Sequence, residues 1–293
     1  MVTQPDHGQI AGFVAAHWGN SLFARPGYFS AERVADPERL RAEAILAIAE
    51  HDNGWWEWEA IPDLSAGDGF PAGLGEVLQN QQAGMDRWRS GLARFHHRAM
   101  VNLLISTHAY WLYAARALPN PDLAFNHPLF WKGAPEKLYP GSIEAPLAFM
   151  AELQKKQLGW IEELRTDPAT ASWVESATLA PLQRLLQLCD GISLSLCSAL
   201  ISATTGVSKG LGQDAFELHE VPRRHWDDRC TITVTPRGGG RIELDPYPFD
   251  IDPLPVVMPA RIVELPAEKP AHIHTWWHAR VPQQIEFQFV SAK

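Results

Sequence analysis

The sequence predicts a mainly α-helical protein with a small C-terminal β module. Apolar residues recur at helical spacing through most of the first 205 residues, whereas residues 216–293 contain short stretches in which apolar and polar residues alternate. The 293 residues are enough for one large domain or two smaller ones. We therefore expect a helical domain over residues 1–205 and a β-rich module over residues 216–293 that packs on it.

Two helices are expected near the N-terminus. The first covers residues 6–18, where apolar residues lie three and four positions apart. The second begins at Asp36-Pro37, because aspartate caps helices and proline fits the first turn. Its apolar pattern continues to His51-Asp52, and Gly54 ends it.

The rest of the helical region alternates with stretches rich in turn-forming residues. Residues 61–75 are rich in Gly, Pro, Ser and Asp and are expected to form a loop. One long helix, or two in tandem, follows over residues 78–118. Residues 120–141 are expected to form an ordered connection, and further helices are expected near residues 144–165 and 179–203.

The pattern changes to alternation after residue 212. Residues 231–235 and 241–244, separated by glycines at 238–240, are expected to form a β-hairpin. Residues 261–265 and 285–289 are expected to be further strands.

Composition and charge narrow the class of protein. The chain is 46% hydrophobic and 20% charged, as in soluble globular proteins. A net charge of -9 argues against general nucleic-acid binding but leaves room for a small anionic substrate. The three cysteines form no CxxC pair, the N-terminus lacks a signal peptide, and no apolar stretch is as long as a membrane helix. We expect a cytoplasmic protein with no membrane partner; the oligomeric state is left open.

The residues that most demand a chemical explanation are His51 and Asp52, within residues 49–59. Adjacent at the end of a helix, they supply one nitrogen and one oxygen ligand. That combination suits a divalent transition metal.

Three further polar residues lie in or near apolar helices. Asp190 is surrounded by apolar residues, so it needs a cation, a hydrogen-bond network or a raised pKa. His108 lies in a similarly apolar stretch, and His7 lies near the start of the first helix. Each has a structural alternative. Asp190 could be bonded to backbone or to an arginine, His108 could be an ordinary core histidine, and His7 could be a surface or capping residue. Together with the dyad, they indicate a metal site between facing helices.

This order of residues resembles the HD-domain superfamily of metal-dependent phosphohydrolases. The resemblance implies an HD-domain-like helical bundle in which His7, His51, Asp52 and Asp190 bind one divalent metal. Two-metal members add histidines between the His-Asp pair and the last Asp, and His108 is the expected added ligand.

The chain departs from the superfamily in two ways. His51 lies 44 positions after His7, a rather long gap, and the added histidines are not clear. His97 and His108 would lie roughly 16 Å apart on an unbroken helix, too far to share one metal. The number of metal ions is therefore left open.

Four stretches resemble more closely a family of uncharacterised bacterial proteins, the DUF3891 domain of unknown function. They are residues 4–7, 49–55, 106–108 and 189–194. This resemblance bears on the fold more than on the function.

Substrate-binding residues are expected beside the metal. Arg94 and Arg98 belong to a local basic patch that could hold an anionic substrate, although a solvated helix face is the alternative. Trp55 follows the dyad directly and could line a pocket or, equally, serve as a core residue. The other members of the patch are Arg87, Arg89 and His97.

A competing metal site lies near the C-terminus. His272 and His274 would point to one face of a strand, as in cupin-type barrels. The glycines and the following carboxylate of a cupin motif are missing, however. The chain also lacks a P-loop, a GxSxG elbow, an HExxH helix and a GxGxxG fingerprint.

These observations favour a metal-dependent hydrolase of HD type that acts on a phosphate ester or phosphoanhydride. Its metal would be Mn, Fe, Ni or Co, with Zn or Mg also possible. Asp52 or Asp190 would also orient the attacking water. One alternative is an HD-type di-iron oxygenase, and another is a non-enzymatic ligand-binding protein.

Overall fold

We describe the fold from a computed structural model of the chain. Four of the predicted segments include residues that the structure does not describe: the helical stretch at 78–118, the connection at 120–141, the helix at 179–203 and the strand at 261–265. The structure describes residues 1–77, 79–128, 141–199, 208–264, 266 and 268–292.

The two N-terminal helices form as the sequence predicts. Helix α1 covers Gln4–Ala16 and begins where the Thr3 hydroxyl accepts a hydrogen bond from the Asp6 amide at 3.2 Å. Helix α2 covers Pro37–Ala49, and Asp36 caps it by accepting from the amide of Arg39. The cap and the proline fix where α2 starts, so His51-Asp52 follows directly after its last turn.

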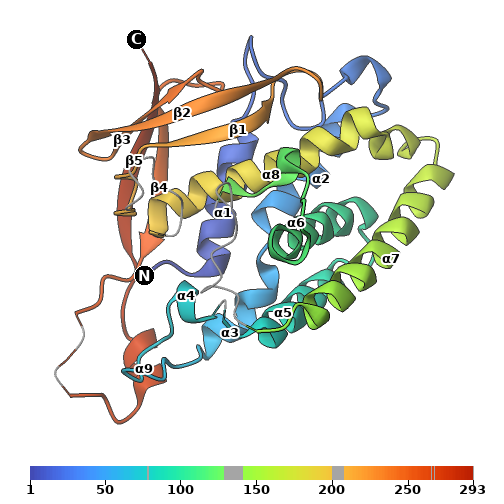
Figure 1. Cartoon of the computed structure of the whole chain (residues 1–293). Helices are drawn as coiled ribbons and strands as arrows, with labels where there is room; N and C mark the ends of the chain where they lie inside the picture. Colours follow the sequence, from blue (N-terminus) through green and yellow to red (C-terminus); the bar gives the residue numbers. More distant parts are fainter. Residues whose placement is uncertain (78, 129–140, 200–207, 265, 267, 293) are drawn as a thin grey trace.

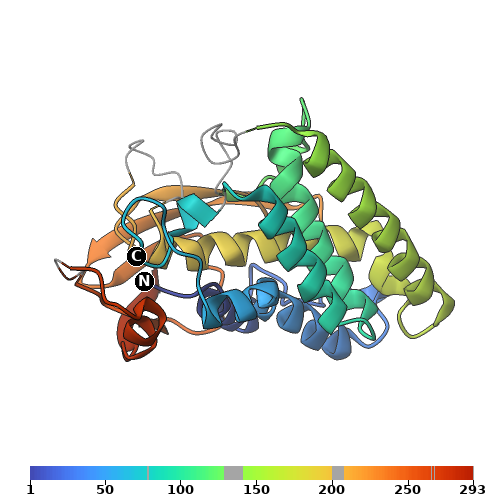
Figure 2. The same cartoon turned by 90° about the horizontal axis from the view of Figure 1, so that it is seen from below.

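Four longer helices complete the helical body (Figure 1). They are α5 (Gln81–Arg94), α6 (Ala99–Ala117), α7 (Glu144–Thr166) and α8 (Ser176–Cys197). The break between α5 and α6 confirms two tandem helices rather than one long one. Helix α8 passes through the middle of the molecule and packs against α1, α2 and α6 (Figure 2).

Short helical segments connect these elements. They are η1 (Ala31–Arg33), η2 (Asn53–Trp55), α3 (Trp56–Ala60), α4 (Leu74–Val77), η3 (Leu123–Phe125), η6 (Ala171–Val174) and α9 (Ile273–His278).

A five-stranded mixed sheet covers one end of the helices (Figure 1). The strand order is β1-β2-β3-β5-β4; β3 and β5 pair in parallel, and the other neighbours pair antiparallel. The strands are β1 (Phe216–Pro222), β2 (Arg229–Gly238), β3 (Arg241–Asp245), β4 (Leu254–Ala260) and β5 (Gln283–Ser291).

The expectation of a mainly α, HD-like bundle with a small β module is wrong. Of the described residues, about 49% are helical and about 16% are in β structure, most of it in the five strands of a substantial half-barrel. Strands β1 and β4 were not predicted, and the strand expected at 261–265 is absent from the described residues 261–264. Prolines at 255 and 259 weaken the strand pattern of β4, but an edge strand tolerates proline because half of its amides need no partner.

Helices and sheet share one apolar core. Helix α8 packs on β1 and α1 packs on β4. Trp18, fully buried after α1, meets Phe249 of the β region edge to face with ring centres 5.8 Å apart. The division of the chain at residues 205 and 216 into two domains stays a prediction.

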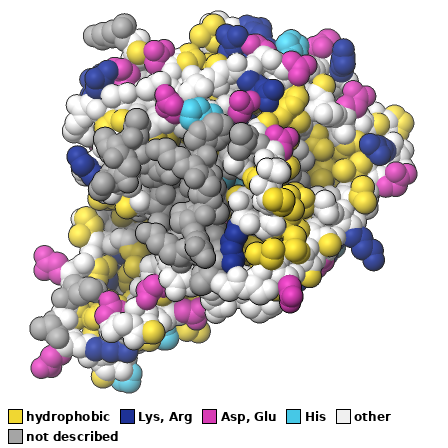
Figure 3. Space-filling model, in the orientation of Figure 1, with side chains coloured by type: hydrophobic (Ala, Val, Ile, Leu, Met, Phe, Trp, Pro, Cys, Tyr) yellow, Lys and Arg dark blue, Asp and Glu magenta, His cyan; other side chains and the backbone are white. Residues whose placement is uncertain are grey.

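Helix hydropathy and surface charge were also compared with the sequence-based expectations. None of the described helices is both long and apolar enough to span a membrane. On the face shown in Figure 3, acidic and basic side chains are interspersed rather than separated by sign.

Candidate metal centre

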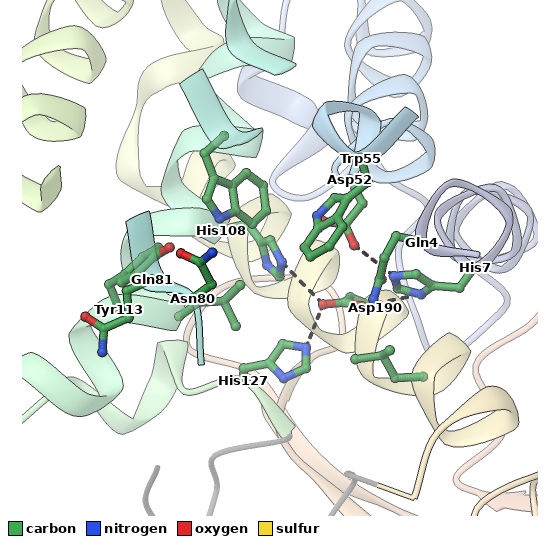
Figure 4. A pocket seen from close by; sticks show the side chains of 13 residues that line it. Gln4, His7, Asp52, Trp55, Asn80, Gln81, His108, Tyr113, His127 and Asp190 are labelled. Atoms are coloured by element: carbon green, nitrogen blue, oxygen red, sulfur yellow. Dashed lines mark hydrogen bonds and ion pairs between the residues drawn. The ribbon is translucent and has the colours of Figure 1, made fainter. Parts of the chain in front are cut away.

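Five chain segments bring titratable side chains to one buried point beside the middle of α8 (Figure 4). Asp190 comes from α8 and His7 from the first turns of α1. His51 and Asp52 follow α2, and His108 lies in the middle of α6. The last member, His127, follows η3 directly.

Asp190 lies at the centre of these side chains. Its Oδ2 is 2.8 Å from His127 Nε2 and 3.3 Å from His108 Nε2. Its Oδ1 is 3.5 Å from His51 Nε2 and 3.7 Å from His7 Nδ1. One carboxylate is thus within 4 Å of four imidazoles.

Asp52 closes the other side of the centre. Its Oδ2 lies 3.1 Å from His7 Nε2 and 3.7 Å from His51 Nε2. Two sets of ligand atoms lie within 4.8 Å of one another, and His51 belongs to both. The sets are His7 with His51 and Asp52, and His51 with His108 and Asp190.

Close packing of α1 against the end of α2 lets these ligands meet. A Cβ on Gly8 would lie 2.9 Å from the carbonyl oxygen of Ala49, and one on Gly12 would lie 2.5 Å from the Ala49 Cβ. A larger residue at either position would push α1 away from α2. Glycine there therefore brings His7 to the dyad.

Hydrogen bonds behind two of the histidines fix which ring nitrogen faces the centre. His51 Nδ1 donates to the carbonyl of Ile48 at 2.7 Å. The Ser193 hydroxyl donates its proton to the backbone carbonyl of Asp190, so the 2.7 Å bond between His7 Nδ1 and Ser193 Oγ has the imidazole as donor. In the neutral form of each ring, the Nε2 lone pair then points inward, as metal-bound histidines require.

Burial and charge set the protonation of the centre. Burial opposes the charging of His51, but the carboxylates of Asp52 and Asp190 outweigh it and raise its pKa to about 9. Burial would also raise the pKa of Asp190, yet the imidazoles of His127 and His51 hold it well below its usual range. Burial lowers the pKa of His108 to about 4, so this ring is neutral.

The residues fit a bound metal ion. His51 Nε2 and Asp190 Oδ1 are buried and have no hydrogen-bond partner among the described residues. Imidazole nitrogens and carboxylate oxygens are donors that divalent transition metals accept. A cation here would satisfy both atoms and displace the proton of His51.

A cavity of about 80 Å³ adjoins the centre. This volume holds several water molecules or a small substrate group. In Figure 4 the centre lies on one side, while Asn80, Gln81 and Tyr113 lie across the cavity from it. Most of the lining surface is apolar. The aromatic and aliphatic residues in it are Trp55, Trp88, Leu112, Tyr113 and Leu194, and the side-chain amides are those of Gln4, Asn80 and Gln81. The remaining lining residues belong to the centre: His7, Asp52, His108, His127 and Asp190.

The structure brings all five predicted ligands together and places Trp55 in the cavity wall. Arg94 and Arg98 are not among the described lining residues. Arg94 donates to the Asn53 side chain at 2.9 Å and pairs with Glu57, and Arg98 pairs with Glu43 at 2.6 Å. Their role in substrate binding stays a prediction.

Sequence reasoning missed His127. It lies in the predicted connection at 120–141, between Asn126 and Pro128, where no apolar helix makes a buried histidine conspicuous. It is nevertheless fully buried. The one indication in the sequence was the resemblance described above, in which two-metal members add histidines between the His-Asp pair and the last Asp.

The C-terminal histidines have another role. Residues 273–278 form helix α9, so His272 and His274 do not lie on a strand as expected. His274 Nε2 lies 3.1 Å from the carbonyl oxygen of Pro62, and His278 Nε2 lies 2.5 Å from that of Ala60. These contacts attach α9 to the last residue of α3 and to the loop that follows it.

Comparison with known proteins identifies a family that the chain matches. A family model described as "Protein of unknown function (DUF3891)" matches residues 1–265. No curated protein and no solved structure matches the chain.

Proposed function

We propose that this chain, which belongs to the DUF3891 family of proteins of unknown function, is a metal-dependent hydrolase acting on a phosphate ester or phosphoanhydride. The observation that carries the proposal is the convergence of four imidazoles and two carboxylates on one buried point beside a cavity. A group of this kind has little structural use without a cation, because its charges are costly to bury.

Two divalent ions would fit the donors. His7, His51, Asp52 and Asp190 would hold one, and His108 and His127 would hold the second with Asp190 shared between them. Their order along the chain resembles that of two-metal members of the HD superfamily. We propose a relationship through this ligand set and not through the bundle fold. The metal would be Mn, Fe, Ni or Co, with Zn or Mg also possible.

Bound ions would supply Lewis-acid polarisation of a phosphoryl oxygen and a water of lowered pKa. The protein's own part follows from the geometry. Asp52 lies at the edge of both the ligand set and the cavity, where its carboxylate can orient a water molecule toward the substrate. Trp55 and Trp88 line the cavity and limit the access of bulk water.

The cavity walls favour one alternative function, a di-iron oxygenase. Its lining beyond the metal ligands consists largely of tryptophan, leucine and tyrosine side chains. Such walls suit an apolar substrate group better than a polyphosphate. Two irons per chain and an oxygen-dependent reaction would favour this function over hydrolysis.

The substrate would be a small anionic molecule, and we place the protein in the cytoplasm. The three described thiols Cys189, Cys197 and Cys230 are all free, which suits a reducing compartment.

The test combines metal analysis with an activity panel. Purified protein is analysed for metal and then assayed on phosphate monoesters, diesters and nucleotides with each metal added. His51→Ala should lose metal and turnover together. His17→Ala is the matched control, because His17 also pairs with an aspartate, Asp250 at 2.9 Å, but lies on the surface away from the centre.

The outcomes separate the candidate functions. Turnover of a phosphate compound that disappears in His51→Ala but not in His17→Ala supports the hydrolase. Retained metal without turnover of any phosphate compound argues against it. If His51→Ala changes stability but removes no metal, the cluster is structural and the protein is a non-enzymatic ligand-binding protein.

A further inference from the structure

The segment that carries His127 is held at three points, two before the histidine and one after it. Phe125 stacks between Trp111 of α6 and Trp226 of the β1–β2 loop, with ring centres 5.0 and 5.1 Å away. The backbone carbonyl of Asn126 accepts a hydrogen bond from Arg184. Pro128 lies against Gly191 of α8 so closely that a Cβ on that glycine would be 2.6 Å from Pro128 Cγ. His127 is thus fixed from both sides.

Arg184 is the unusual member of this set. It lies on α8, six positions before Asp190, and is completely buried. Burial lowers the pKa of its guanidinium to about 9, so it still carries its charge at neutral pH. Its partners are uncharged oxygens: the carbonyl of Asn126, the side chain of Gln187 at 3.1 Å and the carbonyl of His219 at 2.5 Å.

The His219 carbonyl comes from an irregular part of the sheet. The register of β1 with β2 shifts between Leu218 and Val221, and Glu220 adopts a left-handed backbone with φ of 55°. His219 lies inside this bulge. Bulges redirect backbone groups out of the ladder and occur often beside functional sites.

We propose that Arg184 is a positioning residue that fixes His127 in the metal centre and uses the bulge of β1 as its support. The inference rests on the proposed metal centre. One arm of the guanidinium, Nη1, holds the segment before His127, and the other, Nη2, holds the sheet. The sheet then contributes to the centre without supplying a ligand.

The two-armed contact distinguishes arginine from lysine. A lysine keeps the charge but has a single ammonium group, which cannot reproduce a planar fork directed at two separate carbonyls. Arg184→Lys should therefore release either Asn126 or His219. Loss of support behind a metal ligand typically costs 10- to 100-fold in metal affinity.

The experiment titrates the metal-free full chain with Mn²⁺ alone and measures binding by isothermal titration calorimetry. The wild type should bind two ions. Arg184→Lys should bind one of them about 10- to 100-fold more weakly and the other unchanged. The same substitution is then made in a His127→Ala background, where it should weaken Mn²⁺ binding less than about twofold. The effects of two substitutions do not add when one residue acts through the other.

A second readout needs no metal. The imidazole resonances of His127, assigned by their loss in His127→Ala, should shift or broaden in metal-free Arg184→Lys, while those of surface His17 stay in place. If Arg184→Lys does not fold, Arg184→Gln replaces it, because a neutral amide costs less to bury than an unsatisfied ammonium.

Two results would overturn the proposal. One is unchanged Mn²⁺ binding together with unchanged His127 resonances in the Arg184 variant. The other is an equal loss of affinity in the presence and absence of His127, which would mean that Arg184 acts elsewhere. If the chain binds Mn²⁺ but turns over no phosphate compound, the proposed hydrolase function is contradicted and the proposed role of Arg184 is not. If the wild type binds no Mn²⁺, manganese is excluded as the metal, and the His127 resonances of the metal-free protein decide the role of Arg184.

Discussion

Replacement of Gly191 by alanine tests how tightly α8 holds the segment of His127. In most helices this change is stabilising by about 1 kcal/mol. Here the new Cβ would lie 2.6 Å from Pro128 Cγ and 2.9 Å from Pro128 Cβ, whereas ordinary contact begins near 3.4 Å. The proline ring must therefore retreat by at least about 0.8 Å.

The balance of these effects gives the magnitude. Overpacking of a buried contact costs about 1–3 kcal/mol, which exceeds the gain in helix propensity. We expect Gly191→Ala to lower the free energy of unfolding by about 1 kcal/mol, and to weaken metal binding because His127 moves with Pro128. Urea unfolding monitored by tryptophan fluorescence, with and without chelator, measures both.

Gly159 provides the matched control. It lies in the middle of α7, is exposed, and a Cβ there would meet nothing within 4 Å. Gly159→Ala should stabilise the protein by about 0.5–1 kcal/mol and leave metal binding unchanged. If Gly191→Ala stabilises the protein as much as Gly159→Ala does, the close contact between α8 and Pro128 does not hold His127 in place.

Three further predictions follow from charge and ligand binding. Burial raises the pKa of Glu59 to about 7, so the contribution of this side chain to stability is complete below about pH 4.5 and is lost as the pH rises through 7. Glu59→Gln should therefore stabilise the protein by about 1–2 kcal/mol more at pH 8 than at pH 5. An equal effect of the substitution at both pH values in urea unfolding would contradict this. Asp190→Asn should abolish binding of both ions, since this carboxylate contacts four imidazoles, and retention of either ion in elemental analysis would show that Asp190 is not a shared ligand. Chelation of the native protein should lower its stability by about 2.7 kcal/mol when free metal had been at 100 times its Kd, and a melting curve that chelator leaves unchanged would exclude a bound ion.

The sequence was most informative where helices carry the site. The caps of α2 and the apolar pattern around Asp190 were enough to predict where these elements lie and that their polar residues face inward. A polar residue in an apolar helix is conspicuous because burial without a partner is costly. All five predicted ligands consequently meet in the structure.

The sequence was least informative where irregular backbone carries the site. His127 follows a short 3-10 segment, and its burial depends on Arg184 and Gly191, which lie some 60 residues later in the chain. No local pattern reports a contact of that kind. The extent of the sheet was missed for a similar reason, because β4 contains prolines that only its edge position makes acceptable.

The positions of the ligands along the chain have a consequence for folding. His7 and Asp190 are separated by 183 residues, and every other ligand lies between them. Contacts over such distances form slowly, because the entropy of closing a long loop must be overcome first. The complete set of donors therefore exists only after α8 has docked against α1, α2 and α6. A nascent chain that has not yet reached Asp190 lacks part of this donor set, so the complete site can take up metal only after α8 has been made and has docked.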